Sequence, residues 1–303
     1  MDGLTWQEHI LPTADLDIAW YEVGNGPTVV FLNGGPGDSH RYLRPVVAPL
    51  ADRFHCVLYD QRGCGRSRLD HPDESALRVH RFVDDLEALR RRLGQERLAL
   101  VGHSWGATLA LVYAIAHPDH VERVALLSMG PIDDEMDTVA EANILKPLSA
   151  VERDELATLR AELPRAARAG DEERVRVLRE REASLSMRAW FASPAALEGF
   201  LVAYRTEDPT NRRVNRLAWA SYRDVRAGLA YERVTAPVLI LYGYQDFEPI
   251  TQAFALRERL PRARVRFLNQ CGHEPWLEQP QQFYRELWAF LDDAPAPTSA
   301  LQS

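Results

Sequence analysis

Apolar and polar positions form two kinds of pattern, strand-like and helical, over the first 130 residues of the chain. Four runs are continuously apolar, as parallel strands buried on both faces are. These runs span 28–32, 55–59, 98–101 and 124–127. An earlier run, 17–23, alternates in polarity and predicts a half-exposed edge strand, and helical patterns occur at about 78–93 and 105–116. Strands that alternate with helices in this way predict a parallel sheet.

The pattern changes in the middle of the chain. From about Pro131 to Arg233 there is no strong strand pattern, and residues 149–183 predict amphipathic helices that are interrupted at Pro164 and Gly170. Strands and helices then return, at 238–242, 250–260, 264–268 and 280–292. We therefore predict an α/β core domain of residues 1–130 and 234–292, a helical cap of residues 131–233 and a disordered tail of residues 293–303.

Composition and charge narrow the classes of function. The chain has 303 residues, 46% of them hydrophobic, which suffices for one large domain with an insertion. Its formal net charge is −8 and its basic residues form no stripe, so we expect no nucleic-acid partner. It has no apolar run of about 18 residues, no signal-peptide pattern, and only three cysteines without regular spacing. We therefore expect a cytoplasmic protein with no membrane segment.

A candidate nucleophile follows the predicted strand 98–101. Ser104 is the centre of the Gly-x-Ser-x-Gly sequence 102–106, and an apolar helical pattern begins directly after it. Strand, sharp turn and helix are the context of a nucleophile elbow, whose glycines avoid collisions with the neighbouring strand and helix. The turn would expose the Ser104 hydroxyl above the sheet, and the amides of the following helix could stabilise negative charge. We expect His103, inside the turn, to pack beneath it.

A serine hydroxyl needs a general base within hydrogen-bond reach to attack a substrate at neutral pH. Asp246 follows the predicted strand 238–242, and His273 follows the predicted strand 264–268. Active sites of parallel sheets lie at the carboxyl ends of the strands, and Ser, acid, His is the chain order of α/β-hydrolases. We therefore predict a catalytic triad in which Asp246 orients His273 and His273 takes the proton of Ser104.

Acyl transfer also requires hydrogen-bond donors for the oxyanion. The backbone N–H of Trp105, directly after the candidate nucleophile, is one candidate. The other is expected in the loop after strand 28–32, where residues 33–37 are Asn-Gly-Gly-Pro-Gly and glycine lets a backbone amide approach the developing charge. The sequence has neither an HExxH motif nor a Cys/His ligand spacing, so no metal is predicted.

Several motifs of the predicted core occur together. They are Asn33-Gly34-Gly35-Pro36-Gly37, Ser39-His40, Tyr42-Leu43, the run from Asp60 to Ser67, and Ser104-Trp105-Gly106. This set resembles the proline iminopeptidase family of α/β-hydrolases, which includes the tricorn-interacting aminopeptidases. The resemblance implies the α/β-hydrolase fold, with a mostly parallel central sheet and a helical cap insertion. It implies no cofactor and removal of an N-terminal residue, often proline, from a peptide. The nucleophile, acid, base and two oxyanion amides would be Ser104, Asp246, His273, Gly35 and Trp105.

Two departures from the family bear on the substrate. The glycine loop of family members usually begins with His, whereas this chain has Asn33. The family binds the substrate ammonium with glutamates, but here Phe247 follows the predicted acid, and the cap glutamate would fall near Asn215 or Arg216. The substitute candidates for substrate binding are Glu207 and Glu248.

The cap sequence leaves the substrate open. It carries a group of arginines at Arg205, Arg212, Arg213, Arg216, Arg223 and Arg226. An arginine that faces the pocket would favour an anionic or neutral acyl substrate over an ammonium. The leading hypothesis is a serine hydrolase, most simply an aminopeptidase acting on short peptides or amides. The second is a carboxylesterase, thioesterase, amidase or carbon–carbon bond hydrolase of a small molecule, and the third is a ligand-binding protein on a hydrolase fold.

Overall fold

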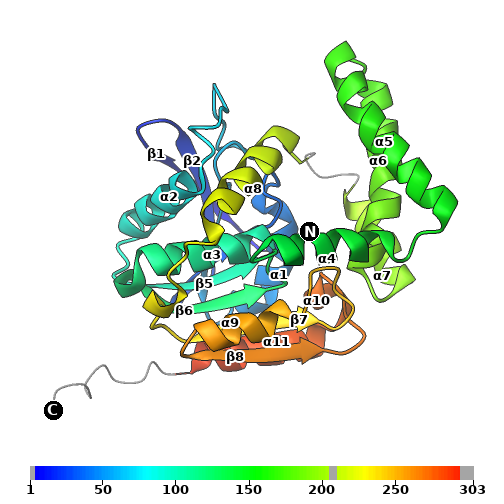
Figure 1. The fold of residues 1–303 in the computed structure, drawn as a ribbon. Coiled ribbons are helices and arrows are strands. Elements are labelled where there is room, and N and C mark those ends of the chain that lie inside the picture. Colours follow the sequence, from blue (N-terminus) through cyan, green and yellow to red (C-terminus); the bar gives the residue numbers. More distant parts are fainter. Residues whose placement is uncertain (1–3, 205–209, 294–303) are drawn as a thin grey trace.

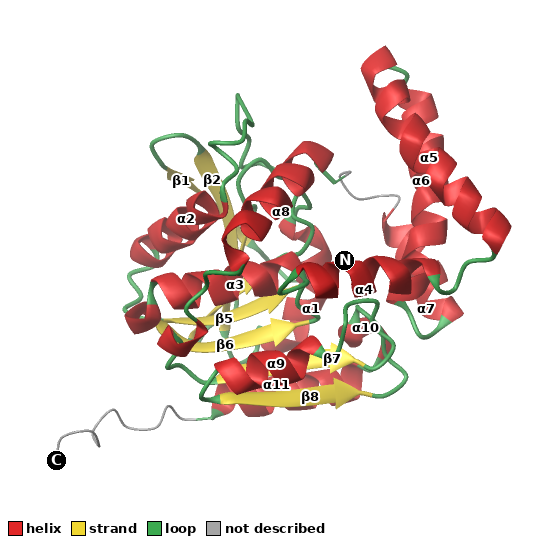
Figure 2. Ribbon diagram, viewed as in Figure 1, coloured by secondary structure: helices red, strands yellow, loops and turns green. Residues whose placement is uncertain are grey.

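An eight-stranded sheet forms the centre of the computed structural model, which describes residues 4–204 and 210–293 (Figure 1, Figure 2). Its strand order is β1-β2-β4-β3-β5-β6-β7-β8. The strands are β1 (Gln7–Pro12), β2 (Asp17–Val23), β3 (Thr28–Leu32), β4 (His55–Tyr59), β5 (Leu98–His103), β6 (Val121–Leu127), β7 (Val238–Gly243) and β8 (Ala263–Leu268). β2 pairs antiparallel with β1 and β4, and the other pairs are parallel. The predicted mostly parallel sheet is therefore confirmed.

The N-terminal hairpin corrects one prediction. β1 was not predicted, because its residues are largely exposed and show no clear apolar alternation. It pairs with β2 along its whole length and takes the edge of the sheet. β2 is consequently an inner strand, with Ile18 and Trp20 in the core on one face and Ala19 and Tyr21 in the core on the other. The prediction of a half-exposed edge strand at 17–23 was wrong.

Helices cover both faces of the sheet (Figure 1). One face is covered by α2 (Val79–Arg92), α3 (Trp105–Ala116), α8 (Arg212–Arg226) and α9 (Gln252–Arg259). The other is covered by α1 (Arg44–Val47), α10 (Pro275–Glu278) and α11 (Pro280–Asp292). All but the last residue of α3 are buried, which explains why its sequence is apolar on every side. Among the described residues, no helix combines the length and the apolar character that crossing a bilayer requires.

The chain between β6 and β7 contains helices and turns but no strand in its described part. The helices before α8 are α4 (Asp134–Leu145), α5 (Ala150–Ala169), α6 (Glu172–Ser186) and α7 (Pro194–Tyr204). α5 and α6 form a hairpin that extends away from the sheet, and its leucines form a small separate core (Figure 1). α8 instead packs into the main core through Val214, Leu217 and Tyr222. The helical segment therefore has one projecting part and one part that is built into the core.

α5 continues through Pro164, where the sequence predicted an interruption. Proline removes the hydrogen bond to the carbonyl four residues earlier, here that of Arg160. Both residues are exposed, so water can satisfy that carbonyl and the helix continues. The helix ends at Gly170, whose φ of +69° gives the left-handed C-cap that glycine favours, and this predicted interruption is confirmed.

The motif from Asp60 to Ser67 supports the neighbouring glycine loop. Asp60 follows β4 and accepts hydrogen bonds from the backbone N–H of His40 (3.1 Å) and of Arg66 (2.9 Å) and from the Tyr21 hydroxyl (3.1 Å). The Nδ1 of the His40 ring lies 2.8 Å from the same carboxylate. This buried carboxylate therefore joins the sheet to the turn that follows the glycine loop.

Candidate active site

Ser104 occupies the sharp turn between β5 and α3. Its φ of +54° lies in the left-handed region, which residues other than glycine seldom adopt. A side chain at position 102 would overlap the carbonyl oxygen of Gly106, and one at position 106 would overlap that of Leu32. Both positions therefore require glycine, for the steric reason expected of a nucleophile elbow. The turn places Ser104 in the lining of a cavity of about 360 Å³.

His273 lines the same cavity and contacts Asp246. Its Nδ1 lies 2.9 Å from Asp246 Oδ1, and both side chains are buried. Because a carboxylate oxygen accepts, Nδ1 carries the proton and Nε2 is left as a proton acceptor. Asp246 Oδ1 also accepts a hydrogen bond from the backbone N–H of Glu248 (3.0 Å). The structure thus gives His273 the tautomer that a general base needs.

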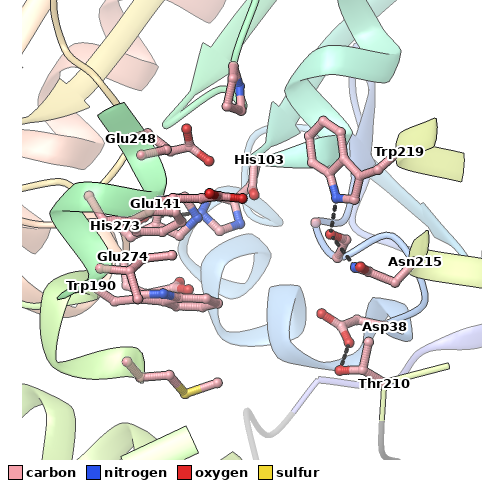
Figure 3. A pocket seen from close by; sticks show the side chains of 18 of the residues that line it. Asp38, His103, Glu141, Trp190, Thr210, Asn215, Trp219, Glu248, His273 and Glu274 are labelled. Atoms are coloured by element: carbon pink, nitrogen blue, oxygen red, sulfur yellow. Dashed lines mark hydrogen bonds between the residues drawn. The ribbon is translucent and has the colours of Figure 1, made fainter. Parts of the chain in front are cut away.

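Aromatic side chains from the helical segment form part of the cavity wall (Figure 3). Trp190, at the end of the short helix Met187–Trp190, stacks on Phe247 with ring centroids 5.4 Å apart. Its ring centroid also lies 5.0 Å from that of His273, and its carbonyl accepts a 2.6 Å hydrogen bond from the His273 backbone. Trp219 of α8 faces the cavity from the other side (Figure 3). These rings give the site the apolar walls that are typical of small-molecule pockets.

Hydrogen bonds from the Asn33 side chain fix the orientation of the Gly35 amide in the glycine loop after β3. Asn33 Nδ2 donates to the carbonyl of Gly34 (3.1 Å) and to that of Asp38 (2.8 Å). The Gly34–Gly35 peptide is trans, so its carbonyl and the Gly35 N–H point in opposite directions. Holding the carbonyl on Asn33 therefore fixes the direction of the Gly35 amide. Asn33, at the position where the family usually has His, therefore supports the glycine loop.

α8 holds the next peptide of the same loop, a contact that sequence reasoning missed. Asn215 Nδ2 donates to the carbonyls of Gly35 and Pro36, both at 2.9 Å, and Trp219 Nε1 donates to the Gly35 carbonyl at 3.1 Å (Figure 3). Asn215 stands near the position expected for the family's cap glutamate. Spacing alone gave no signal that its amide would bind the loop.

Trp105, the other predicted oxyanion donor, begins α3, where the first amides have no acceptor within the helix.

His103 does not simply pack beneath the turn, as the sequence predicted. It is buried but lines the cavity, with Nδ1 2.9 Å from the Tyr42 hydroxyl and Nε2 3.0 Å from the His273 carbonyl. The physical reason is that His103 is the last residue of β5 and its ring makes polar contacts with two of the loops that follow the strands, at Tyr42 and at the His273 carbonyl. Tyr42 belongs to the Tyr42-Leu43 motif, whose role the sequence did not indicate.

Carboxylates predominate among the charged groups of the cavity. They are Asp38, Asp137, Glu141, Glu248 and Glu274. Glu248 is 4% exposed, and its Oε2 has no hydrogen-bond partner among the described residues. Burial, followed by the charges of Asp246 and Asp137, raises the pKa of Glu248 well above its ordinary value. Burial also raises the pKa of Asp38 to about 6, against a 2.5 Å hydrogen bond from Thr210. A cationic group would satisfy this lining better than an anion.

The cap arginines do not supply the opposite charge. Arg223 is the one arginine in the described lining of the cavity, and it forms two hydrogen bonds to Asp137, at 3.0 and 3.2 Å. Arg226 also binds Asp137 and Asp134, and Arg212 binds Glu182. Arg205 lies outside the described residues, as does Glu207, one of the two candidates for substrate binding. One cap arginine, Arg223, therefore does line the cavity, but its charge is paired with Asp137 and is not left to bind an anionic substrate.

A second group of ionisable residues lies outside this cavity. Ligand atoms of Glu87, His117 and His120 come within 4.8 Å of one another, although the sequence showed no metal-binding spacing. The Glu87 carboxylate already accepts hydrogen bonds from Arg90 (2.8 Å), and also from Arg91 and Tyr113, both at 2.9 Å. Two guanidinium groups on this carboxylate disfavour a dication beside it.

Comparison with known proteins shows the family of this chain. Residues 27–280 match the alpha/beta hydrolase fold family, and the chain belongs to it. A proline iminopeptidase from Lactobacillus helveticus is 27% identical over 279 residues, which cover 88% of this chain and 90% of the relative. One from Heyndrickxia coagulans is 42% identical over 108 residues, or 35% of this chain and 36% of the relative. The predicted resemblance to proline iminopeptidases is therefore confirmed.

A solved structure extends the comparison. A proline iminopeptidase-related protein from Thermus thermophilus is 26% identical, with a TM-score of 0.71 over 95% of this chain and 98% of that one. The α/β-hydrolase fold predicted from the sequence is thereby confirmed, and fold and relatives together support a hydrolase. Fold alone hosts many chemistries, so the substrate must be argued from the site.

Proposed function

We propose that this protein is a serine hydrolase of the aminopeptidase type, which releases an N-terminal residue from short peptides or amides. The observation that carries the choice of substrate is Glu248, a buried carboxyl group in the cavity wall with an oxygen that lacks a described partner. A substrate ammonium would supply the missing counter-charge. Glu248 lies two residues after Asp246, so the amine would be held beside the candidate triad.

The proposed mechanism follows from the tautomer of His273 and from the positions of the Gly35 and Trp105 amides. His273, with its proton on Nδ1 and Asp246 behind it, takes the proton of Ser104 through Nε2 as the hydroxyl oxygen attacks the substrate carbonyl. The amides of Gly35 and Trp105 stabilise the oxyanion of the tetrahedral intermediate. His273 then returns the proton to the leaving amine, and an ester between Ser104 and the released residue remains. Water, activated by the same histidine, hydrolyses this ester.

A paired assay tests the proposal. The substrates are prolyl- and alanyl-β-naphthylamide, the same compounds N-acetylated, and a short-chain p-nitrophenyl ester. We expect strong preference for the free amines, and loss of all turnover in Ser104→Ala. Ester turnover without use of the free-amine amides would reject the aminopeptidase and favour the small-molecule esterase. Folded protein that neither turns over any substrate nor reacts with a fluorophosphonate would favour a ligand-binding protein.

Substitution of Glu248 tests the recognition of the amine separately. Glu248→Gln keeps the size of the side chain and removes its charge, so kcat/KM for alanyl-β-naphthylamide should fall at least about tenfold, with the ester unaffected. Glu258→Gln, at an exposed position of α9, is the matched control and should change neither substrate. Equal losses on amide and ester would show that Glu248 supports the fold of the site and does not recognise the amine.

A further inference from the structure

Two side chains, Tyr42 and His103, connect three segments of the candidate active site. Neither takes a direct part in the chemistry proposed at Ser104. Tyr42 follows the glycine loop of β3, and His103 is the last residue of β5, one position before Ser104. The Gly34 backbone N–H donates to the Tyr42 hydroxyl at 2.5 Å. The Tyr42 hydroxyl lies 2.9 Å from His103 Nδ1, and His103 Nε2 lies 3.0 Å from the His273 carbonyl. One chain of hydrogen bonds therefore joins the glycine loop to the histidine loop.

The backbone groups at the two ends of this chain of hydrogen bonds, the Gly34 N–H and the His273 carbonyl, determine which atom donates and which accepts in each bond. The His273 carbonyl can only accept, so His103 Nε2 carries the proton and Nδ1 is an acceptor. Tyr42 must then donate its hydroxyl proton to Nδ1 and accept the Gly34 N–H with its oxygen. Each donor in the chain meets one acceptor, which is the condition under which a buried polar network becomes rigid.

The surroundings keep His103 in this single state. Its ring centroid lies 4.8 Å from those of both His273 and Trp276, and 5.8 Å from that of Tyr42. Burial lowers the pKa of His103 well below its ordinary value, and the neighbouring His273 lowers it further. A protonated ring would carry a second N–H toward Tyr42 and would reverse that hydrogen bond. The neutral tautomer is thus the one that the site can hold.

We propose that Tyr42 and His103 are positioning residues, which hold the oxyanion loop and the general base at a fixed separation. Tyr42 accepts the N–H of Gly34, which belongs to the Asn33–Gly34 peptide, and Asn33 donates to the Gly34 carbonyl, which belongs to the peptide that carries the Gly35 amide. Two consecutive peptides of the loop are therefore held. His103 holds the carbonyl of His273, whose N–H is already bound to the Trp190 carbonyl. This inference rests on the proposed serine hydrolase mechanism. Loss of the network would misplace donors and base together, and small misplacements cost large factors in rate.

Labelling of Ser104 by a fluorophosphonate measures the network without knowledge of the natural substrate. Tyr42→Phe removes only the hydroxyl, and we expect the second-order labelling rate to fall at least about tenfold. For an amide or ester that is turned over, kcat should fall while KM stays within about twofold. Tyr284→Phe in α11 is the matched control, because it removes a tyrosine hydroxyl that donates to a backbone carbonyl, that of Val46 (3.1 Å), and Tyr284 lies outside the lining of the cavity. It should leave labelling unchanged.

Two substitutions at His103 separate positioning from bulk. His103→Gln retains a donor and an acceptor, so this variant should keep part of the wild-type labelling rate. His103→Leu retains neither and should be labelled more slowly than His103→Gln. In wild-type protein with 15N-labelled histidine, NMR should show His103 protonated on Nε2 and unprotonated on Nδ1. Labelling of Tyr42→Phe at the wild-type rate, or a proton on Nδ1, would overturn the inference alone. Wild-type protein that resists labelling would overturn the proposed mechanism and the inference with it.

Discussion

At the scale of single residues, the cavity holds charge that its own contacts do not balance. Asp38 lies beside the glycine loop and receives a hydrogen bond from Thr210, but no described arginine, lysine or histidine pairs with it. The cost of burying its charge appears as a pKa of about 6. A folded-state pKa raised above the ordinary value means that Asp38 stabilises the fold most below pH 4. That contribution is lost as the pH rises from about 4 through 6.

Asp38→Asn should therefore stabilise the protein in a pH-dependent way. Asparagine can still accept the Thr210 hydrogen bond, but it carries no charge. The free energy of unfolding should rise by about 1–3 kcal/mol at pH 8 and change little at pH 4. Urea unfolding of wild type and variant at both pH values measures the difference. An equal effect at the two values would show that the charge of Asp38 is not the cause.

Glu248 allows a second residue-scale prediction, which concerns proton release. Burial holds the carboxyl of Glu248 in its protonated form to a higher pH than usual, because its pKa is raised, and a bound ammonium favours the ionised form. Binding of an amine such as proline amide, in its ammonium form, to Ser104→Ala protein should therefore release protons at pH values above the ordinary range of a carboxyl group. Calorimetry in buffers of different ionisation enthalpy measures the number released. Glu248→Gln should abolish the release, and a release that persists in this variant would assign it to another group.

At the scale of elements, α8 is the part of the helical segment that completes the site. It packs into the main core and donates three hydrogen bonds, from Asn215 and Trp219, to the glycine loop. The Trp219 ring also packs against Trp105, with centroids 5.0 Å apart, and fills the space beside Gly130. α8 therefore affects the oxyanion loop as well as the shape of the pocket.

Asn215→Ala should consequently reduce the rate of the chemical step. Without the amide, the Gly35 and Pro36 carbonyls lose a donor and the loop becomes less well held, so we expect kcat to fall about tenfold on any substrate turned over. Arg216→Ala, at the exposed neighbouring position, is the control and should leave kcat unchanged. A change in KM alone for Asn215→Ala would mean that the residue binds substrate and does not hold the loop.

At the scale of the whole molecule, the features that the sequence predicted are those that residues close together in the chain determine. The elbow around Ser104 was recognisable because its glycines, strand and helix are contiguous, and the apolar strands because both of their faces are buried. β1 was missed because an exposed edge strand has no buried face to produce a pattern. The contacts of Asn215 with Gly35 join positions 180 residues apart, and no local pattern records such a distance. The same limit hid the partners of Tyr42 and His103.

The division of the hydrophobic core predicts how stability is distributed across the molecule. The hairpin of α5 and α6 has only its own small cluster, formed by Leu148, Leu156, Leu159, Leu163, Leu178 and Leu185, whereas α2 and α3 share the large core of the sheet. Segments with few buried apolar contacts open at lower free energy than the whole domain. Backbone amides in the middle of α5 and α6 should therefore exchange with deuterium at least about tenfold faster than those in the middle of α2, a surface helix of similar length to α6. Equal exchange would mean that the hairpin unfolds only together with the sheet, and that the contacts at its base couple the two cores.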